Sequence, residues 1–301
     1  MAIAVLMSSY NGEKYIEEQI ESILAQQCEI PIELFVRDDG STDSTREILQ
    51  KYALQGKLRW YSGENLKPAK SFLELVKHCP GYDYYAFADQ DDYWYPNKLQ
   101  SGILALEKLQ GPGLYFANVQ LVDGALQSLG RNAYRQPPKC DFYSLVVGSN
   151  VLGCTCVFNG ELASLVQRTE TPDKIIMHDS YLAILCTLFG GTVVYDPQAQ
   201  MDYRQHGNNV VGTNWNKWSA LKDRIRRVTK RQKVSIADQA ESILAVCSAA
   251  LDKDKLDFLR KVASYRDSVY KAAALACSNK PKYNGKNMEI TIRLATLLRN
   301  Q

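Results

Sequence analysis

The segment Tyr84-Tyr85-Ala86-Phe87-Ala88-Asp89-Gln90-Asp91-Asp92 joins an apolar run directly to three carboxylates. Such a run is typical of a buried strand, so the carboxylates are expected at the carboxyl end of that strand. Carboxylates this close together repel one another unless a cation lies between them. Their hard oxygen atoms suit Mg2+ or Mn2+, which in turn bind phosphate oxygens. An acidic turn that caps the following helix is the alternative interpretation of the same residues.

Two more apolar runs in the first half of the chain end in polar residues. Ala2–Met7 precedes Ser8-Ser9-Tyr10-Asn11, and Glu33–Arg37 precedes Asp38-Asp39-Gly40-Ser41. Amphipathic stretches such as Lys14–Gln26 separate the runs, and this alternation predicts a mainly parallel sheet covered by helices. Ligands bind such a sheet outside the carboxyl ends of its strands. The sequence therefore predicts one crevice that all three polar segments line.

The remaining chain divides into two parts. Further strands are expected at Leu58–Ser62, Leu114–Val122, Gly153–Phe158 and Thr192–Asp196, and further helices at Asp43–Ala53, Ala69–Lys77, Asn97–Leu109 and Asp179–Leu188. A Ser/Thr cluster is placed to cap the helix at Asp43–Ala53. After Trp215 the strand signals fade and helical stretches follow. We therefore expect an α/β domain over residues 1–213 and a helical extension over residues 214–301.

Composition excludes several classes of protein. With 46% hydrophobic residues, 23% charged residues and a formal charge of +3, the chain is neither disordered nor a whole-chain polyanion binder. It has no apolar run long enough to span a membrane and no basic region before its first apolar run, so we expect a cytoplasmic protein. Eight scattered Cys without a CxxC pair, and three well-separated His, predict reduced thiols rather than a zinc cluster. The sequence motifs of P-loop, Rossmann, zinc-protease and GxSxG enzymes are missing.

At this point a family resemblance is visible. Ser8–Glu13, Arg37–Asp43 and Phe87–Asp92, in this order, resemble family 2 glycosyltransferases with the GT-A fold. Met177-His178-Asp179 and Tyr203–Asn209 continue the match and are most similar to the bacterial rhamnosyltransferase branch, which builds cell-wall and capsular polysaccharides. The resemblance implies an inverting transfer of a sugar from a nucleotide diphosphate to an acceptor hydroxyl.

The resemblance also implies roles for the residues of the predicted crevice. Asp39 would hold the nucleobase through the ring N3–H, with Ser8 and Tyr10 beside it. Asp89 and Asp91 would form the DxD motif of the family, in which Asp91 is the metal ligand for Mg2+ or Mn2+. Asp92 would support that site next to the nucleotide sugar.

Later segments supply the remaining candidates. Asp179 matches the acidic catalytic base of the family and would take the acceptor proton, although the residue could instead be the N-cap of a helix beginning at Ser180. Lys70 matches a basic residue near the nucleotide in relatives. Arg204 would approach the diphosphate and His206 the metal from a later loop.

The donor and the reaction leave alternatives open. The resemblance favours dTDP-L-rhamnose as donor and a saccharide or lipid-linked acceptor, while UDP-hexoses stay open because an N3–H contact does not separate thymine from uracil. A sugar-phosphate nucleotidyltransferase should carry a glycine-rich and basic loop after the first strand, and Ser8–Lys14 contains only Gly12 and Lys14. A non-catalytic nucleotide-sugar sensor is disfavoured by the intact acidic set.

The helical extension begins with a basic segment. Lys217–Lys233 contains eight Lys or Arg and one acidic residue, and Trp215, Trp218 and Leu221 fall at helical spacing. This pattern predicts either an interfacial helix on anionic lipid, on the cytoplasmic face of the membrane, or a helix packed on the catalytic domain. Nucleic acid is not an expected partner, since the patch is short and no binding motif accompanies it.

Overall fold

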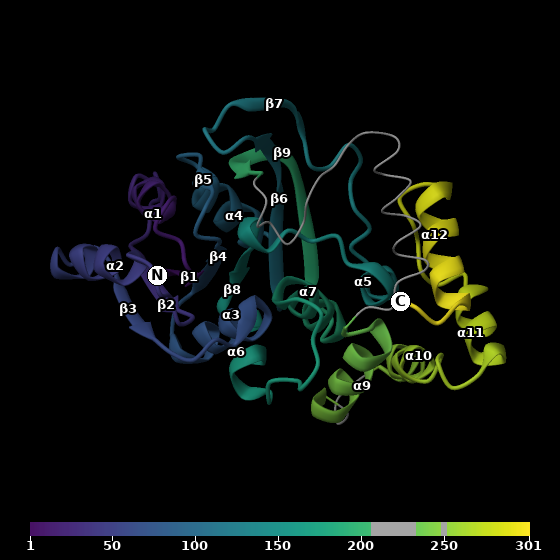
Figure 1. The fold of residues 1–301 in the computed structure, drawn as a ribbon. Helices are drawn as coiled ribbons and strands as arrows, with labels where there is room; N and C mark the ends of the chain where they lie inside the picture. Colours follow the sequence, from purple (N-terminus) through teal and green to yellow (C-terminus); the bar gives the residue numbers. More distant parts are fainter. Residues whose placement is uncertain (206–232, 248–251) are drawn as a thin grey trace.

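The computed structural model describes residues 1–205, 233–247 and 252–301 (Figure 1). Within these residues nine strands form one mixed sheet, in the order β3-β2-β1-β4-β8-β6-β9-β5, with β7 paired to β6. The strands are β1 (Ile3–Ser9), β2 (Ile32–Asp38), β3 (Arg59–Ser62), β4 (Tyr84–Ala88), β5 (Tyr93–Trp94), β6 (Gly113–Val122), β7 (Ser128–Asn132), β8 (Val157–Asn159) and β9 (Thr192–Arg204).

The first half of the sheet is parallel, as the sequence predicts. β1 pairs with β2 and with β4 in parallel, and Ile3 lies opposite both Ile32 and Tyr84. Residues of β1 alternate between two hydrophobic clusters: Val5 packs on one side of the sheet and Leu6 on the other. Both faces are therefore covered, which explains why this strand is an unbroken apolar run.

The second half of the sheet is mixed and departs from two expectations. β9 runs for 13 residues, well beyond the expected end at Asp196, because the strand continues past Pro197 through a register shift against β6. The expected strand Gly153–Phe158 is wrong in its first half: Gly153–Thr155 form a 3-10 helix, η1, before β8. The Thr155 hydroxyl donates to the Leu152 carbonyl, which favours this local turn over extension.

Helices cover both faces of the sheet. α1 (Ile16–Leu24), α2 (Thr45–Leu54) and α4 (Lys98–Leu106) pack on one face, and α3 (Lys67–His78), α5 (Phe142–Gly148), α6 (Gly160–Arg168) and α7 (His178–Leu188) pack on the other. The predicted Ser/Thr cap of α2 is wrong in detail. Ser44 at the N-cap makes no side-chain cap bond, and an Asp43 carboxylate oxygen accepts from the Thr45 amide at 3.1 Å instead.

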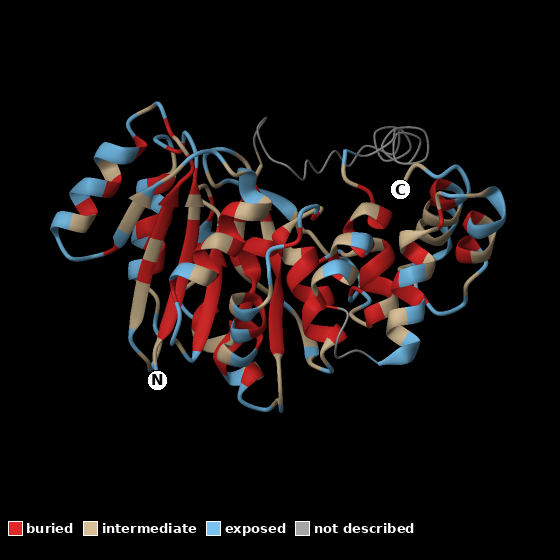
Figure 2. Ribbon diagram, turned by 90° about the horizontal axis from the view of Figure 1, so that it is seen from below, coloured by how far each residue is buried: buried red, intermediate tan, exposed pale blue. Residues whose placement is uncertain are grey.

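The C-terminal helices extend the hydrophobic cluster that contains Leu6 of β1. α9 (Ile236–Cys247), α10 (Lys253–Ala263), α11 (Val269–Ala276) and α12 (Lys286–Leu297) follow the α/β part (Figure 1). Ile243 of α9 and Leu259 of α10 are buried in the same cluster as Phe142 and Tyr181, and Figure 2 shows buried residues continuing from the sheet into these helices. The described helices of the predicted extension therefore share a core with the α/β part.

Two expectations from the sequence concern residues that the structure does not describe. The boundary near residue 213 and residues 217–232 of the basic segment lie outside the described residues, and both stay predictions. In the described part of the chain, every helix is too short or too polar to cross a bilayer.

Candidate active site

A cleft of about 720 Å3 lies at the carboxyl ends of β1, β2 and β4. The prediction of one crevice lined by three polar segments is confirmed, because residues that follow all three strands line this cleft. Residues from the η1 region and from the start of α7 close its other side. The lining includes Ser8, Tyr10, Asn11, Gly12, Asp39, Lys67, Phe72, Asp89, Gln90, Asp91, Gly153, Cys154, His178, Asp179 and Tyr203.

Hydrogen bonds between loops hold the strand ends together. The Tyr10 amide donates to Gln90 Oε1 at 2.8 Å, and Gln90 Nε2 returns a bond to the Tyr10 carbonyl at 3.0 Å. The Gly12 amide donates to Thr45 Oγ1 at 2.8 Å. A Cβ on Gly12 would lie 2.3 Å from Gln90 Oε1, so only glycine permits this approach. The cleft floor is thus fixed by its own loops.

Asp39 is the most firmly held of the predicted binding residues. It is only 2% exposed, and Arg37 forms an ion pair with its carboxylate. The Leu66 and Lys67 amides, at the start of α3, donate to the same carboxylate at 2.9 and 3.0 Å. Arg37 also bonds the Glu64 carbonyl at 2.9 Å, so one buried guanidinium fixes both Asp39 and the loop before α3.

The other predicted nucleotide-binding residues differ in their position relative to the cleft. Tyr10 is 48% exposed at the cleft and leaves its ring available for stacking. Ser8 lines the cleft and its hydroxyl bonds that of Ser71 at 2.6 Å. Lys70 does not line the cleft, and its Nζ lies 3.7 Å from an Asp173 carboxylate oxygen. Lys67, one turn earlier on α3, lines the cleft, as does Lys14.

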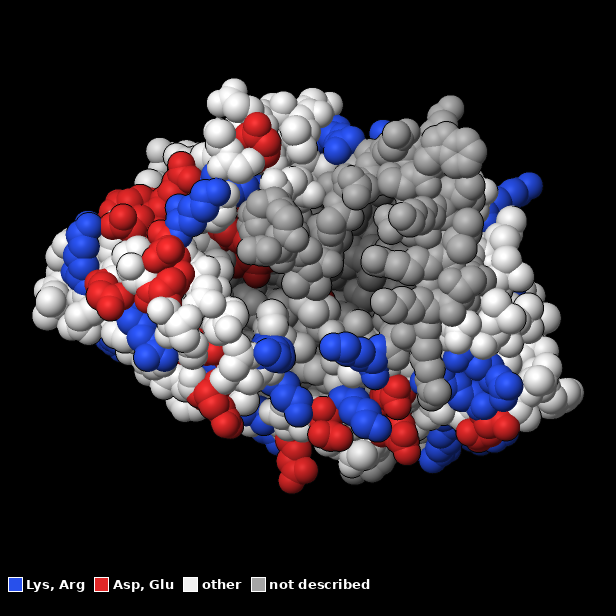
Figure 3. Space-filling model, in the orientation of Figure 1, with Lys and Arg blue, Asp and Glu red and all other residues white. Residues whose placement is uncertain are grey.

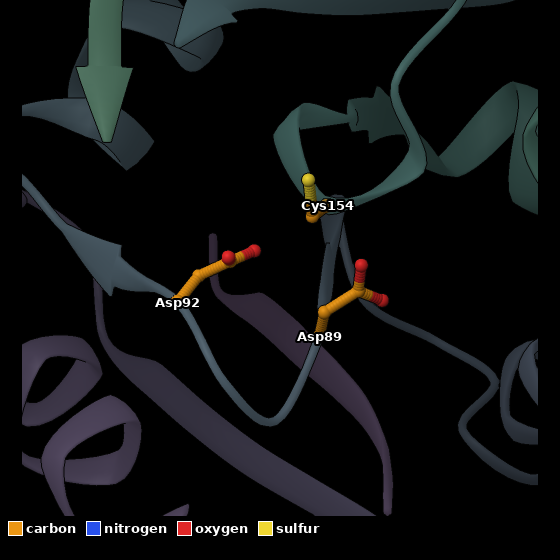
Figure 4. Close-up of side chains that lie close together, drawn as sticks. All are labelled: Asp89, Asp92 and Cys154. Carbon is orange, nitrogen blue, oxygen red and sulfur yellow. The ribbon is translucent and has the colours of Figure 1, made fainter. Parts of the chain in front are cut away.

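The loop after β4 gathers three possible ligand atoms. One carboxylate oxygen each from Asp89 and Asp92 and the Cys154 sulfur all lie within 4.8 Å of one another (Figure 4). Asp92 is fully buried, and its Oδ2 has no hydrogen-bond partner among the described residues. Asp91, the predicted metal ligand, lines the cleft beside this cluster. Its assignment stays a prediction, and the sequence did not predict that Cys154 would join the carboxylates of this loop.

Electrostatics at this loop favour a bound cation. Burial, followed by the charges of Asp91 and Asp179, raises the pKa of Asp89 to about 7. Burial and the same kind of repulsion raise the pKa of Asp92 well above its ordinary range. Burial also raises the pKa of the Cys154 thiol, so the sulfur stays protonated and is a poor ligand. Carboxylate oxygens suit Mg2+ or Mn2+, and the residues present therefore fit such an ion.

Arg204 supports the acidic loop from behind instead of lining the cleft. Its Nε donates to the Asp91 carbonyl at 2.8 Å and its backbone amide donates to Asp92 Oδ1 at 3.1 Å. The guanidinium also ion-pairs with Glu18, and the residue is 2% exposed. Arg204 does not line the cleft in this structure, and the expectation that it approaches the diphosphate stays a prediction. His206 lies outside the described residues, and its role stays a prediction.

Asp179 occupies the second position of α7, at the edge of the cleft. The alternative N-cap role is wrong, because the helix begins at His178 and its N-cap is Met177. The Gly153 amide donates to Asp179 Oδ2 at 2.9 Å. Burial raises the pKa of Asp179 to about 6. A carboxylate with a pKa in this range accepts protons effectively near neutral pH.

The surroundings of two residues at or near the cleft were not predicted, although one of them, His178, belongs to a segment that carries the family resemblance. His178 is 2% exposed and stacks on Phe72, with ring centroids 4.1 Å apart, where it forms part of the wall next to Asp179. Lys98 is fully buried, with its Nζ 3.5 Å from the Trp94 ring centroid, and burial lowers its pKa to about 7. No motif or spacing in the sequence indicated either environment.

A mixed sheet with an acidic loop and a large cleft at its parallel strand ends is the arrangement of the GT-A glycosyltransferases. Solved structures share this fold. S. aureus TarS (residues 1–349) in complex with UDP-GlcNAc matches with a TM-score of 0.56 and 18% identity, over 93% of this chain and 77% of that one. The mannosyltransferase PcManGT from Pyrobaculum calidifontis, in complex with GDP-Man and Mn2+, matches with a TM-score of 0.50 and 18% identity, over 99% and 86%.

The chain belongs to glycosyl transferase family 2, whose model matches residues 4–159. It is 31% identical to the dTDP-rhamnosyl transferase RfbG of Shigella flexneri, over 69% of this chain and 74% of that protein. It is also 28% identical to the uncharacterized glycosyltransferase alr2836 of Nostoc sp., over 69% of this chain and 66% of that protein. The predicted family and enzyme class are therefore confirmed: the protein is a glycosyltransferase.

Proposed function

We propose that this glycosyltransferase is an inverting, divalent-metal-dependent enzyme that moves L-rhamnose from dTDP-L-rhamnose to a hydroxyl of a cell-surface polysaccharide or lipid-linked acceptor. The observation that carries the proposal is that Asp39, Asp89, Asp91 and Asp179 line a single cleft. A base-binding carboxylate, an acidic metal-binding loop and a general base are the three parts that such a transfer requires.

Each part has a distinct task in the proposed reaction. Asp39, held by Arg37, receives the N3–H of the nucleobase while the exposed Tyr10 ring stacks on it. Asp89, Asp91 and Asp92 would hold a divalent metal ion, which when bound would supply positive charge next to the leaving nucleoside diphosphate. Asp179 takes the proton of the acceptor hydroxyl as that oxygen bonds to the anomeric carbon. Attack opposite the leaving group inverts that carbon.

The choice of donor rests on the relative named as a dTDP-rhamnosyl transferase. A UDP-hexose is the alternative donor, and a solved structure of similar fold holds UDP-GlcNAc. A nucleotidyltransferase remains the alternative of another reaction class. The peripheral membrane contact predicted for the basic segment Lys217–Lys233 belongs to the same proposal, because it would bring the enzyme to a lipid-linked acceptor.

A donor panel tests the reaction class and the donor together. The purified protein is incubated with dTDP-L-rhamnose, UDP-hexoses and GDP-mannose in the presence of Mg2+ or Mn2+ and a lipid-linked or saccharide acceptor. We expect release of dTDP above all other nucleoside diphosphates. Release of UDP alone would replace the donor, and pyrophosphate formation would overturn the transferase mechanism.

Arg37 offers a separate test of the nucleotide-binding part. Arg37→Met removes the charge-assisted bonds to Asp39 and to the loop before α3. Such bonds contribute about 1.5–3 kcal/mol each, so we expect the donor KM to rise about tenfold to a hundredfold with kcat little changed. Arg37→Lys should recover part of the loss, since it restores the charge without the planar fork.

The matched control is Arg59→Met on the neighbouring strand β3. The Arg59 side chain forms an ion pair with Glu33 at 3.2 Å and is 73% exposed, whereas Asp39 is buried. We expect this variant to keep the wild-type KM. If Arg37→Met instead lowers kcat at unchanged KM while the melting temperature is preserved, Arg37 does not act through donor binding.

A further inference from the structure

The outward face of α12 is apolar, which is the reverse of an ordinary surface helix. Ile290, Leu294, Leu297 and Leu298 are 55%, 45%, 39% and 55% exposed. They recur at intervals of three and four residues and therefore share one face of the helix.

The inward face of the same helix carries smaller side chains. Thr291, Ala295 and Thr296 are the buried residues of α12. A helix that folds onto a core normally buries its large apolar residues and exposes its polar ones. Packing within the described chain therefore does not explain why this helix carries a row of exposed leucine and isoleucine side chains.

The neighbouring helix adds to this surface. α11 contacts α12, and its first residues Val269 and Tyr270 are 66% and 84% exposed. Both helices lie at the end of the molecule opposite α1 and α2 (Figure 1). A concentration of exposed apolar side chains of this kind marks an interaction surface.

The net charge around the surface is positive. The C-terminal helical region, residues 252–301, contains eleven Lys or Arg and five Asp or Glu, a formal charge of +6 against +3 for the whole chain. Among its basic side chains, Lys271, Lys280 and Arg293 form ion pairs with Asp267, Asp254 and Glu289. Lys286 begins α12 and Arg299 follows it, so basic side chains lie at both ends of the apolar row. Figure 3 shows blue side chains with red ones among them below the pale right-hand edge, over the same end of the molecule.

We propose that α12, with the first turn of α11, docks this enzyme on an anionic membrane surface. Apolar side chains enter the boundary between headgroups and acyl chains while the flanking Lys and Arg meet the lipid phosphates. This surface is distinct from the basic segment Lys217–Lys233, and it does not depend on the identity of the sugar that the enzyme transfers.

A second copy of the chain fits this surface less well. An isologous contact would place two regions of net positive charge against each other, and antiparallel α12 helices would bring Lys286 of one copy towards Arg299 of the other. Like charges at the border of a contact oppose association, whereas an anionic bilayer complements them.

Vesicle co-sedimentation of the full-length protein tests the proposal. Wild-type protein is mixed with vesicles of phosphatidylcholine alone or of phosphatidylcholine with phosphatidylglycerol. We expect binding to the anionic vesicles that weakens as salt is raised. Ile290→Glu with Leu294→Glu should lower the bound fraction at least about tenfold, because it removes apolar insertion and adds negative charge.

The matched control carries the same kind of change on exposed leucines elsewhere. Leu54 on α2 and Leu104 on α4 are 79% and 47% exposed. Leu54→Glu with Leu104→Glu adds the same charge and should bind vesicles like the wild type. Unchanged circular dichroism and unchanged nucleoside diphosphate release from the donor in solution would show that both double variants are folded.

Three results would overturn the proposal. The first is wild-type protein that stays in the supernatant with anionic vesicles at low salt. The second is binding that survives Ile290→Glu with Leu294→Glu but is lost when Arg226, Arg227, Lys230 and Arg231 are changed to Glu, which assigns docking to the basic segment. The third is a dimer in light scattering that this α12 variant dissociates, which assigns the surface to a second copy.

Discussion

Asp179→Asn is expected to lower kcat by about 10^2–10^4-fold while donor binding survives, because the amide keeps the shape of the side chain but does not take a proton. The side-chain amide oxygen of this variant remains able to accept the bond that the Gly153 amide donates at 2.9 Å in the wild type. The loss should therefore appear in sugar transfer at saturating donor. Single-turnover assays of product formation, beside calorimetric measurement of donor affinity, separate the two effects.

The pH profile gives this prediction a second readout. Burial raises the pKa of Asp179 to about 6, and the base acts only as a carboxylate. For the wild type we expect kcat/KM to fall as the pH is lowered through about 6. The residual activity of Asp179→Asn should lose the part of that acidic limb that Asp179 causes, and what remains should reflect protonation of Asp89.

Stability should not account for the loss of activity. A folded-state pKa above the ordinary value of 3.8 means that the protonated form stabilises the fold, and that this contribution disappears as the pH rises through about 6. At neutral pH the buried carboxylate no longer contributes it, so the neutral Asn variant should melt at the same temperature or higher. Asp173→Asn, at a carboxylate that is 85% exposed, is the matched control and should keep full activity. Near-normal turnover by Asp179→Asn would remove Asp179 from the base role.

The sequence predicted the cleft because short-range patterns determine it. Apolar runs identify β1, β2 and β4, the residues that follow each run are polar, and parallel pairing brings those ends together. The position of Asp179 came from the family resemblance, and its place at the edge of the cleft depends on η1, which the sequence did not predict. A glycine amide that reaches Asp179 from 26 residues away leaves no periodic signal.

The differences between the expected and the observed positions share a physical cause. Arg204 and Lys70 are basic residues in segments that resemble nucleotide-binding ones, and a sequence does not specify which acceptor each side chain finds. Arg204 forms an ion pair with Glu18 and donates to backbone carbonyls, whereas Lys70 forms an ion pair with Asp173. The hydrogen bond that Asp92 accepts from the Arg204 amide of β9 is a further long-range contact. Only the packed chain determines these partners.

Removal of the divalent metal is expected to abolish transfer, and Asp91→Asn is expected to lower kcat/KM by about 10^2-fold or more. Lewis-acid stabilisation of a leaving diphosphate contributes several kcal/mol, and each ~1.4 kcal/mol corresponds to a factor of ten. Chelator should abolish the transfer activity of the wild type, and addition of Mg2+ or Mn2+ should restore that activity. Full turnover in chelator would refute a metal-dependent reaction.

The ligand set can be resolved by comparing single variants at the same loop. Direct Mn2+ binding without donor, measured by electron paramagnetic resonance, should weaken in Asp89→Asn and Asp92→Asn if the atoms that converge in the structure hold the ion. It should weaken in Asp91→Asn if the family pattern holds. Asp83→Asn, at the opposite end of β4, is the control and should bind Mn2+ like the wild type, since its carboxylate accepts from the Ala2 amide 2.7 Å away.

Because the repulsion that raises the pKa of Asp89 comes partly from Asp91, loss of Asp91 alone should also bring the pKa of Asp89 down towards its ordinary value. If Asp92→Asn loses Mn2+ binding while Asp91 still raises the pKa of Asp89, Asp92 rather than the DxD pair is assigned as the ligand.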